Sequence, residues 1–110
     1  MAENIVDKIV KTYTKYVDED LDIYGGNRYL TVAFETMIHE ALKNVIDPGE
    51  LQKIATELRD KLLEGPGSLN PYVMEVLGIL EESASEENLK EALELCRRLL
   101  KEDRFDKIEV

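Results

Sequence analysis

Four carboxylates precede two glycines and an arginine in the stretch DEDLDIYGGNR, residues 18–28. Such a stretch could ligate a metal ion or hold a phosphate. A calcium loop of the EF-hand kind needs oxygen ligands at alternate positions, a glycine at position six and a glutamate at position twelve. If the loop started at Asp18, position twelve would be Tyr29. If it started at Asp20, position twelve would be Thr31. Neither register fits, so we predict no metal site here.

The two glycines do not form a phosphate-binding loop either. GGNR has neither the G-x-x-x-x-G-K-[ST] nor the G-x-G-x-x-G spacing. The four nearby carboxylates would also repel a phosphate. We therefore interpret the stretch as a connector between two helices. Gly25 and Gly26 would allow the chain to reverse, and Asn27 would cap the next helix.

His39 is the only histidine, which excludes metal sites built on several histidines. On a helical wheel it lies about 140° from the middle of its helix's apolar face, so we expect its side chain to be exposed. In this respect the chain resembles histidine phosphotransfer domains, which are small acidic helical bundles with one exposed histidine. The resemblance implies His39 as a phosphoacceptor. Those domains carry a His-x-x-Lys-Gly motif, whereas here Leu42 and Lys43 occupy the third and fourth places after His39.

Paired carboxylates and a lone cysteine are the remaining candidates for chemistry. The chain is similar in its acid pairs to the all-helical, magnesium-dependent nucleotide pyrophosphohydrolases, whose E-x-x-E helix precedes an E-x-x-D helix. Here the pairs Glu57–Asp60 and Glu91–Glu94 occur in the reverse order. Cys96 falls inside an apolar stripe, and no His or Lys is spaced to activate it locally, so we predict a buried, inert thiol. We predict no catalytic residue, no metal and no cofactor, and hence no enzyme.

The elements that carry these residues are predicted to be helices. Apolar residues recur at steps of three and four in five segments, which are separated by Gly, Pro and Asn-Pro signals. We predict helices over about 2–17, 28–46, 48–64, 71–82 and 86–103, with a tail over 104–110. The chain is long enough for one domain with its own core. The predicted fold is therefore a single all-α domain, a compact antiparallel bundle of four to five helices.

Local signals give two further expectations about these helices. The third and fourth helices should each begin with a capping residue followed by proline, at Asp47-Pro48 and at Asn70-Pro71. Gly78 stands in the middle of the fourth helix, where glycine costs about 1 kcal/mol relative to alanine. We expect close packing against another helix to explain this glycine.

The net charge of −10, from 24 acidic and 14 basic residues, bounds the classes of partner. Nucleic acids and anionic membranes are bound by clustered Lys and Arg, so we predict neither as a direct partner. No window approaches the roughly 18 apolar residues of a membrane span. A single cysteine and a start without a basic leader favour the cytoplasm. Abundant Glu and Lys lean toward a thermophilic source.

The surface of the protein is therefore the predicted carrier of its function. We predict an adaptor or regulatory module that acts through protein–protein contacts, with self-association into a homodimer as one form. Tyrosine is enriched in interfaces, and the candidate interface residues are Tyr13, Tyr16, Tyr24 and Tyr29. The first-helix stripe is also what a bundle helix needs for its own core, and the sequence favours that role for the stripe. Two alternatives are an acidic nucleic-acid mimic that inhibits a nucleic-acid-binding protein, and phosphotransfer through His39.

Overall fold

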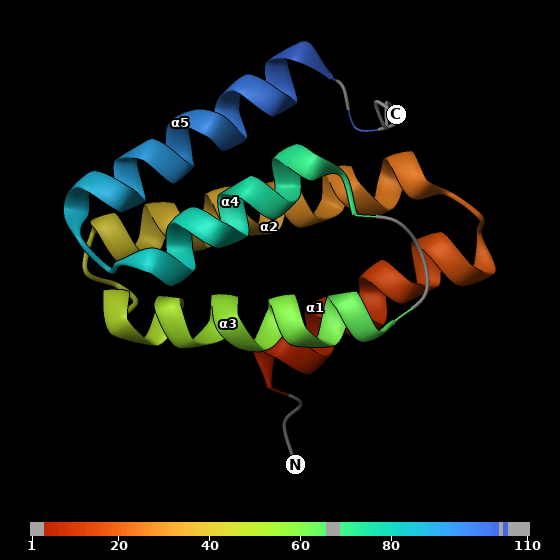
Figure 1. Cartoon of the computed structure of the whole chain (residues 1–110), viewed down its shortest axis with the longest axis horizontal. Coiled ribbons are helices and arrows are strands. Elements are labelled where there is room, and N and C mark those ends of the chain that lie inside the picture. The colour runs from red at the N-terminus through yellow and green to blue at the C-terminus, as the bar shows by residue number, and fades with distance from the viewer. Residues whose placement is uncertain (1–3, 66–68, 104, 106–110) are drawn as a thin grey trace.

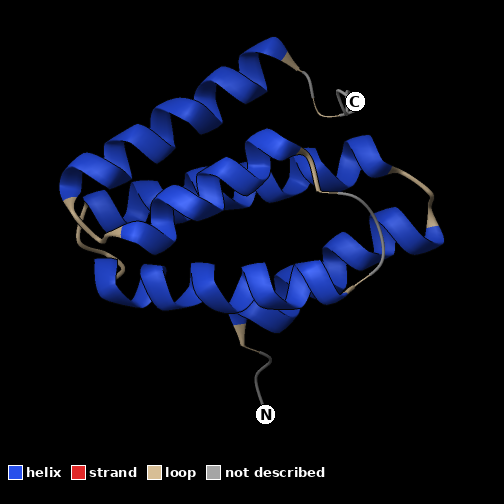
Figure 2. Ribbon diagram, in the orientation of Figure 1, coloured by secondary structure: helices blue, strands red, loops and turns tan. Residues whose placement is uncertain are grey.

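Five α-helices and one short π-helical segment make up the fold in a computed structural model of the chain, which describes residues 4–65, 69–103 and 105. The elements are α1 (Ile5–Thr14), η1 (Lys15–Glu19), α2 (Ile23–Leu42), α3 (Pro48–Glu64), α4 (Pro71–Glu82) and α5 (Glu86–Glu102). Within those residues there is no strand (Figure 2). The predicted all-α fold class is confirmed.

Successive helices run in alternating directions, and α2 is their common neighbour (Figure 1). It packs against α1, α3, α4 and α5. Its residues Leu30, Phe34 and Ile38 are fully buried. Leu58 of α3 and Leu77 of α4 join them in the same core. The molecule is thin in one direction, with extents of 38 × 36 × 19 Å. None of the described helices combines the length and hydropathy that a bilayer crossing needs.

The first helix begins later than predicted and ends in a widened turn. Asn4 caps α1, because its Oδ1 accepts a hydrogen bond from the Asp7 N–H at 2.9 Å. The helix therefore starts at Ile5 rather than near residue 2. The chain then continues as η1 beyond residue 17, the predicted end. The left-handed conformation of Leu21, with φ of 53°, completes the reversal into α2.

The second helix begins five residues earlier than predicted, at Ile23. Its cap is Asp22, whose Oδ1 accepts a hydrogen bond from the Gly25 N–H at 2.8 Å. Gly25, Gly26 and Asn27 lie inside the first turns of α2. The predicted reversal at the two glycines and the predicted Asn27 cap are therefore wrong.

The second helix also ends earlier than predicted, at Leu42 rather than at residue 46. Asn44 adopts the left-handed conformation with φ of 60°, which asparagine tolerates better than most residues. The N–H groups of Asn44 and Val45 donate to the carbonyls of Ala41 and Glu40, at 3.1 and 2.8 Å. This is the hydrogen-bond pattern of a Schellman motif, which ends a helix by satisfying its last carbonyls.

The later helices follow the local signals closely. The structure gives α3 and α4 their predicted bounds, and α5 ends one residue before the predicted position. Asn70 caps α4 by accepting a hydrogen bond from the Tyr72 N–H at 2.8 Å. Asp47 occupies the cap position of α3, but its side chain makes no capping hydrogen bond. Of the predicted tail 104–110, the structure describes Phe105 alone.

Gly78 is exposed, and a Cβ built on it meets no atom within 4 Å. The expected close packing is therefore wrong. Gly78→Ala should raise the free energy of unfolding by about 1 kcal/mol, because alanine loses less backbone entropy in a helix. Urea unfolding followed by circular dichroism measures this change. The matched control is Gly26→Ala, whose Cβ would lie 3.0 Å from Val17 and 3.1 Å from Tyr13. The control should show no gain in the free energy of unfolding. Equal gains at both sites would contradict the open space at Gly78 and the close contacts at Gly26.

Candidate functional site

The acidic stretch forms the turn between η1 and α2. Asp18, Glu19 and Asp20 are exposed to solvent, and Asp22 is used as the cap of α2. Across the described part of the chain, no group of three or more His, Cys, Asp or Glu side chains is placed to hold a metal ion. One of these carboxylates, that of Asp22, therefore has a structural role as a helix cap. The other three face water.

His39 is half-buried, and it contacts α5 rather than lying free on the surface. Arg97 Nη2 lies 2.7 Å from His39 Nε2. A guanidinium group can only donate, so Nε2 is the acceptor in this contact. The lone pair that would attack a phosphoryl group is therefore occupied. This geometry gives the phosphotransfer alternative no support.

Cys96 is fully buried on α5. Burial and, to a smaller extent, the charge of Glu35 raise the pKa of its thiol to about 12. The thiolate is the reactive form. At about pH 8 we therefore expect iodoacetamide to modify the folded protein more than about a hundredfold more slowly than the protein in concentrated urea. Mass spectrometry over time measures both rates, and similar rates would show that the thiol is accessible in the folded state.

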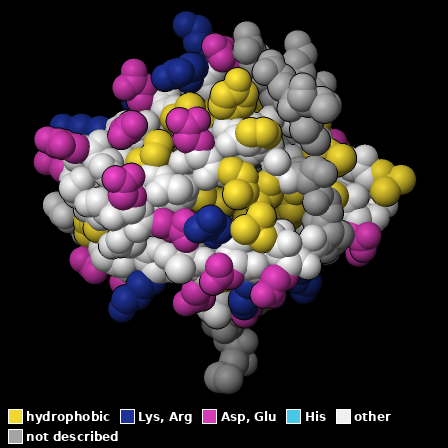
Figure 3. Space-filling view, in the orientation of Figure 1, with side chains coloured by type: hydrophobic (Ala, Val, Ile, Leu, Met, Phe, Trp, Pro, Cys, Tyr) yellow, Lys and Arg dark blue, Asp and Glu magenta, His cyan; other side chains and the backbone are white. Residues whose placement is uncertain are grey.

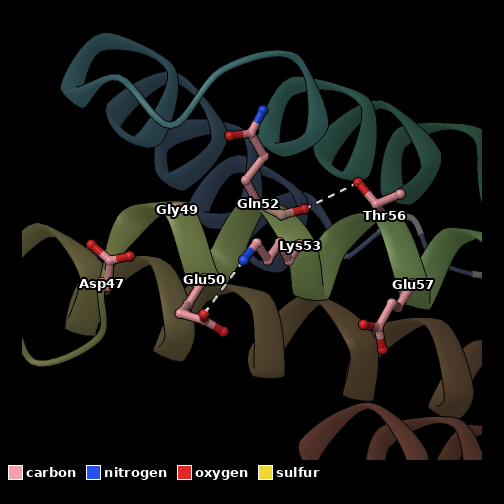
Figure 4. Close-up of a pocket in the computed structure, with 7 residues that line it drawn as sticks. All are labelled: Asp47, Gly49, Glu50, Gln52, Lys53, Thr56 and Glu57. Carbon is pink, nitrogen blue, oxygen red and sulfur yellow. Dashed lines mark hydrogen bonds and ion pairs between the residues drawn. The ribbon is translucent and has the colours of Figure 1, made fainter.

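A shallow depression runs along the exposed side of α3 (Figure 4). Its lining residues are Asp47, Gly49, Glu50, Gln52, Lys53, Thr56 and Glu57. Lys53 pairs with Glu50 at 3.9 Å, and the Thr56 hydroxyl donates to the Gln52 carbonyl at 3.1 Å. The Gln52 amide reaches α4 and donates to the Glu81 carbonyl at 2.8 Å. Since α3 and its cap position Asp47 supply the whole lining, and no second element contributes a polar group to it, we assign this depression no chemistry.

The four candidate tyrosines occupy three different places. Tyr13 is 1% exposed and packs against Gly26, so its side chain belongs to the core. Its hydroxyl has no hydrogen-bond partner among the described residues, and burial raises its pKa. Tyr24 meets Phe105 edge-on with ring centroids 6.0 Å apart, and its hydroxyl donates to the carboxylate of Asp103.

Tyr16 and Tyr29 are the pair that the fold brings together at the surface. Their rings stack with centroids 5.8 Å apart and an interplanar angle of 30°. This pair joins η1 to the first half of α2, which pack side by side at the right of Figure 1. Both side chains are partly exposed.

An uncharged surface extends from the stacked pair along α2. Tyr29, Val32, Ala33 and Thr36 lie within about 100° of the helix circumference. Val32 is 40% exposed and Thr36 is exposed, while Tyr29 and Ala33 are half-buried. We call Tyr16, Tyr29, Val32, Ala33 and Thr36 together the tyrosine face. Sequence reasoning found its two tyrosines and missed the rest, although the uncharged run from 29 to 34 was a usable signal.

A row of basic residues lies on α1 and η1. Lys8, Lys11 and Lys15 are exposed, and they line one shallow depression together with Thr12, Thr14 and Glu19. We call these three lysines the lysine row. In the part of the chain that the structure covers, none of them is in an ion pair. The sequence already places these lysines on one side of the helix, opposite its apolar stripe, because they recur at steps of three and four.

The face seen in Figure 3 carries acidic and basic side chains that are interspersed. Hydrophobic side chains also gather there between α3 and α4, the two helices that residues 66–68 join in the sequence. Because residues 66–68 lie outside the described residues, we assign no role to that group.

Comparison with known proteins finds no matching family model and no significant similarity to a curated protein or to a solved structure.

Proposed function

We propose that this protein is a protein-contact module, an adaptor or regulatory protein that binds its partner through the tyrosine face. One observation carries the proposal. Tyr29, Val32, Ala33 and Thr36 form an uncharged strip over two turns of α2, with Arg28 and Glu35 at its borders, in a chain of which 35% is charged. Surface helices normally present charged and polar residues to water. The centres of protein interfaces are instead depleted of charge and enriched in tyrosine.

The tyrosine face is partly ordered before a partner binds. The Thr36 hydroxyl donates to the Val32 carbonyl at 3.0 Å, which leaves its methyl group available for contact. Tyr16 and Tyr29 hold each other in a stacked arrangement before any partner arrives. Side chains that are already ordered lose less entropy on binding. These features favour a contact surface over a catalytic one.

The test is an affinity capture with the full-length tagged protein from nuclease-treated lysate of its source. Wild type should retain a stoichiometric partner, and Val32→Glu should lose it because a charge would be buried at the centre of the interface. The matched control is Leu63→Glu on α3, which places the same charge on another exposed apolar residue (55% exposed). The control should retain the partner.

Two outcomes would contradict the proposal. Wild type could retain no partner, or Val32→Glu and Leu63→Glu could retain the partner equally. A partner that both variants retain, and whose binding weakens steeply as the salt concentration rises, would instead indicate the nucleic-acid mimic. Binding to an acidic surface is mainly electrostatic.

A further inference from the structure

We propose that the partner presents a helix with an apolar stripe flanked by carboxylates. The tyrosine face would receive the stripe, and the lysine row would receive the carboxylates. This inference rests on the proposed function, and it specifies the chemistry of the partner.

The first argument is that the lysines of the row outnumber the acids beside them, since Glu19 is the one acid that lines their depression. Residues 5–17 contain three lysines and one acid, Asp7. That acid already pairs with Lys61 of α3 at 2.7 Å. By contrast, Lys53 and Lys90 each pair with a glutamate on their own helix. Three lysines that share their depression with a single glutamate leave a local positive excess, in a chain with 24 acids and 14 bases, and this excess is complementary to carboxylates.

The second argument is that the lysine row borders the tyrosine face. Thr12 lies among the lysines in their depression, and it precedes Tyr16 by one helical turn. Tyr16 in turn stacks on Tyr29. Thr12 lies between the lysine row and the tyrosine face. Its hydroxyl donates to the Lys8 carbonyl at 2.9 Å, so this donor is satisfied within the helix. A single ligand lying over Tyr16 and Tyr29 would therefore have the lysine row along one edge.

The spacing of the row favours a helical ligand. Lys8, Lys11 and Lys15 repeat at steps of three and four, and they span about 10.5 Å along the axis at 1.5 Å per residue. A partner helix that lies alongside α1 repeats its own side chains at the same steps. An extended segment repeats every two residues, or about 6.8 Å, and would not match all three lysines.

The charge around the row argues against an extended polyanion. A nucleic acid or an anionic bilayer would reach beyond the three lysines and meet the surplus acids of a chain with a net charge of −10. A short helix covers only the lysine row and the tyrosine face. At physiological salt, repulsion from charges more than about 8 Å away is largely screened.

The inference can be tested with two synthetic helical peptides of about four turns. Each carries leucines on one side, flanked in one peptide by three glutamates at steps of three and four and in the other by glutamines. The glutamate peptide should bind the full-length protein more tightly than the glutamine peptide and shift backbone amide signals of residues 8–16 and 29–36. The triple variant Lys8→Gln, Lys11→Gln, Lys15→Gln should bind it about tenfold more weakly, since exposed ion pairs are individually weak. The matched control Lys43→Gln, Lys90→Gln, Lys101→Gln should bind as wild type does.

Three outcomes would overturn the inference: equal affinity for the two peptides, no saturable binding of either, or saturable binding to phosphatidylserine vesicles in place of the peptide. Its failure is distinguishable from failure of the proposed function. If the captured partner is lost with Val32→Glu but retained by the triple lysine variant, the tyrosine face still binds a partner and the lysine row does not take part.

Discussion

Asn27→Asp is expected to cost about 3–5 kcal/mol of unfolding free energy at neutral pH, because it places a charge in the core. Asn27 is fully buried near the start of α2. Its Nδ2 donates to the Ile23 carbonyl at 2.9 Å, and its Oδ1 accepts from the Asn70 N–H at 2.8 Å. A carboxylate keeps the acceptor for Asn70 but loses the donor toward Ile23. The side chain that links α2 to the cap of α4 would then carry a buried charge.

The cost of Asn27→Asp should depend on pH in a defined direction. Burial raises the pKa of the introduced carboxyl in the folded state above its unfolded value of about 3.9. Between these two pKa values the folded state binds more protons than the unfolded state. The stability of the variant therefore falls as pH rises through this window. Below the unfolded pKa both states are protonated, and the electrostatic part of the cost disappears. Urea unfolding of variant and wild type from about pH 4 to about pH 8 measures the difference.

Asn88→Asp provides the matched control. The Asn88 side chain also donates to a backbone carbonyl, that of Ile79 at 3.0 Å, but the residue is only half-buried. It stands in the first turn of α5, where a negative charge is favoured by the helix dipole. We expect a change of less than about 1 kcal/mol at neutral pH. Equal losses at the two sites would show that burial is not the cause of the effect.

The helices whose ends were predicted correctly are those that end at local chemical signals. Proline fixes the backbone at the start of α3 and of α4, and the apolar period does the rest. The start of α2 has no such signal. Two adjacent glycines indicate a turn when only local entropy is considered. Gly26 is instead helical because the Tyr13 ring and Val17 pack against its Cα, a contact between elements that no local pattern contains.

The same limit applies to the candidate surface. Tyr13 and Tyr16 lie three residues apart on one apolar stripe, and the sequence gives no reason to separate them. Tyr13 is buried because it lies over Gly26, whereas Tyr16 meets Tyr29 at the edge of the same contact. Which tyrosine faces solvent is thus decided by the residue opposite it. Charge spacing, in contrast, is a property of the sequence, so the lysine row could have been predicted.

Phe105→Ala should cost about 3–5 kcal/mol, a loss typical of a fully buried aromatic side chain. Phe105 is 0% exposed although it follows the end of α5. Asp103 adopts φ of 58° and reverses the chain there, and its N–H donates to the Leu99 carbonyl at 2.8 Å. Tyr24 then meets the Phe105 ring edge-on. Thermal and urea unfolding measure the loss. Phe105→Leu, which keeps an apolar side chain in place, should lose much less.

Phe105→Ala also tests whether Tyr24 belongs to the surface that we propose to bind a partner. Tyr24 and Tyr29 are five residues apart and therefore about 140° apart around α2. A domain of this length is typically stable by about 5–15 kcal/mol, so Phe105→Ala should leave folded protein at low temperature. We expect that protein to retain the partner captured by wild type, because Tyr16 and Tyr29 do not contact the altered site. Loss of the partner from folded Phe105→Ala would move the binding surface to Tyr24 and the end of α5.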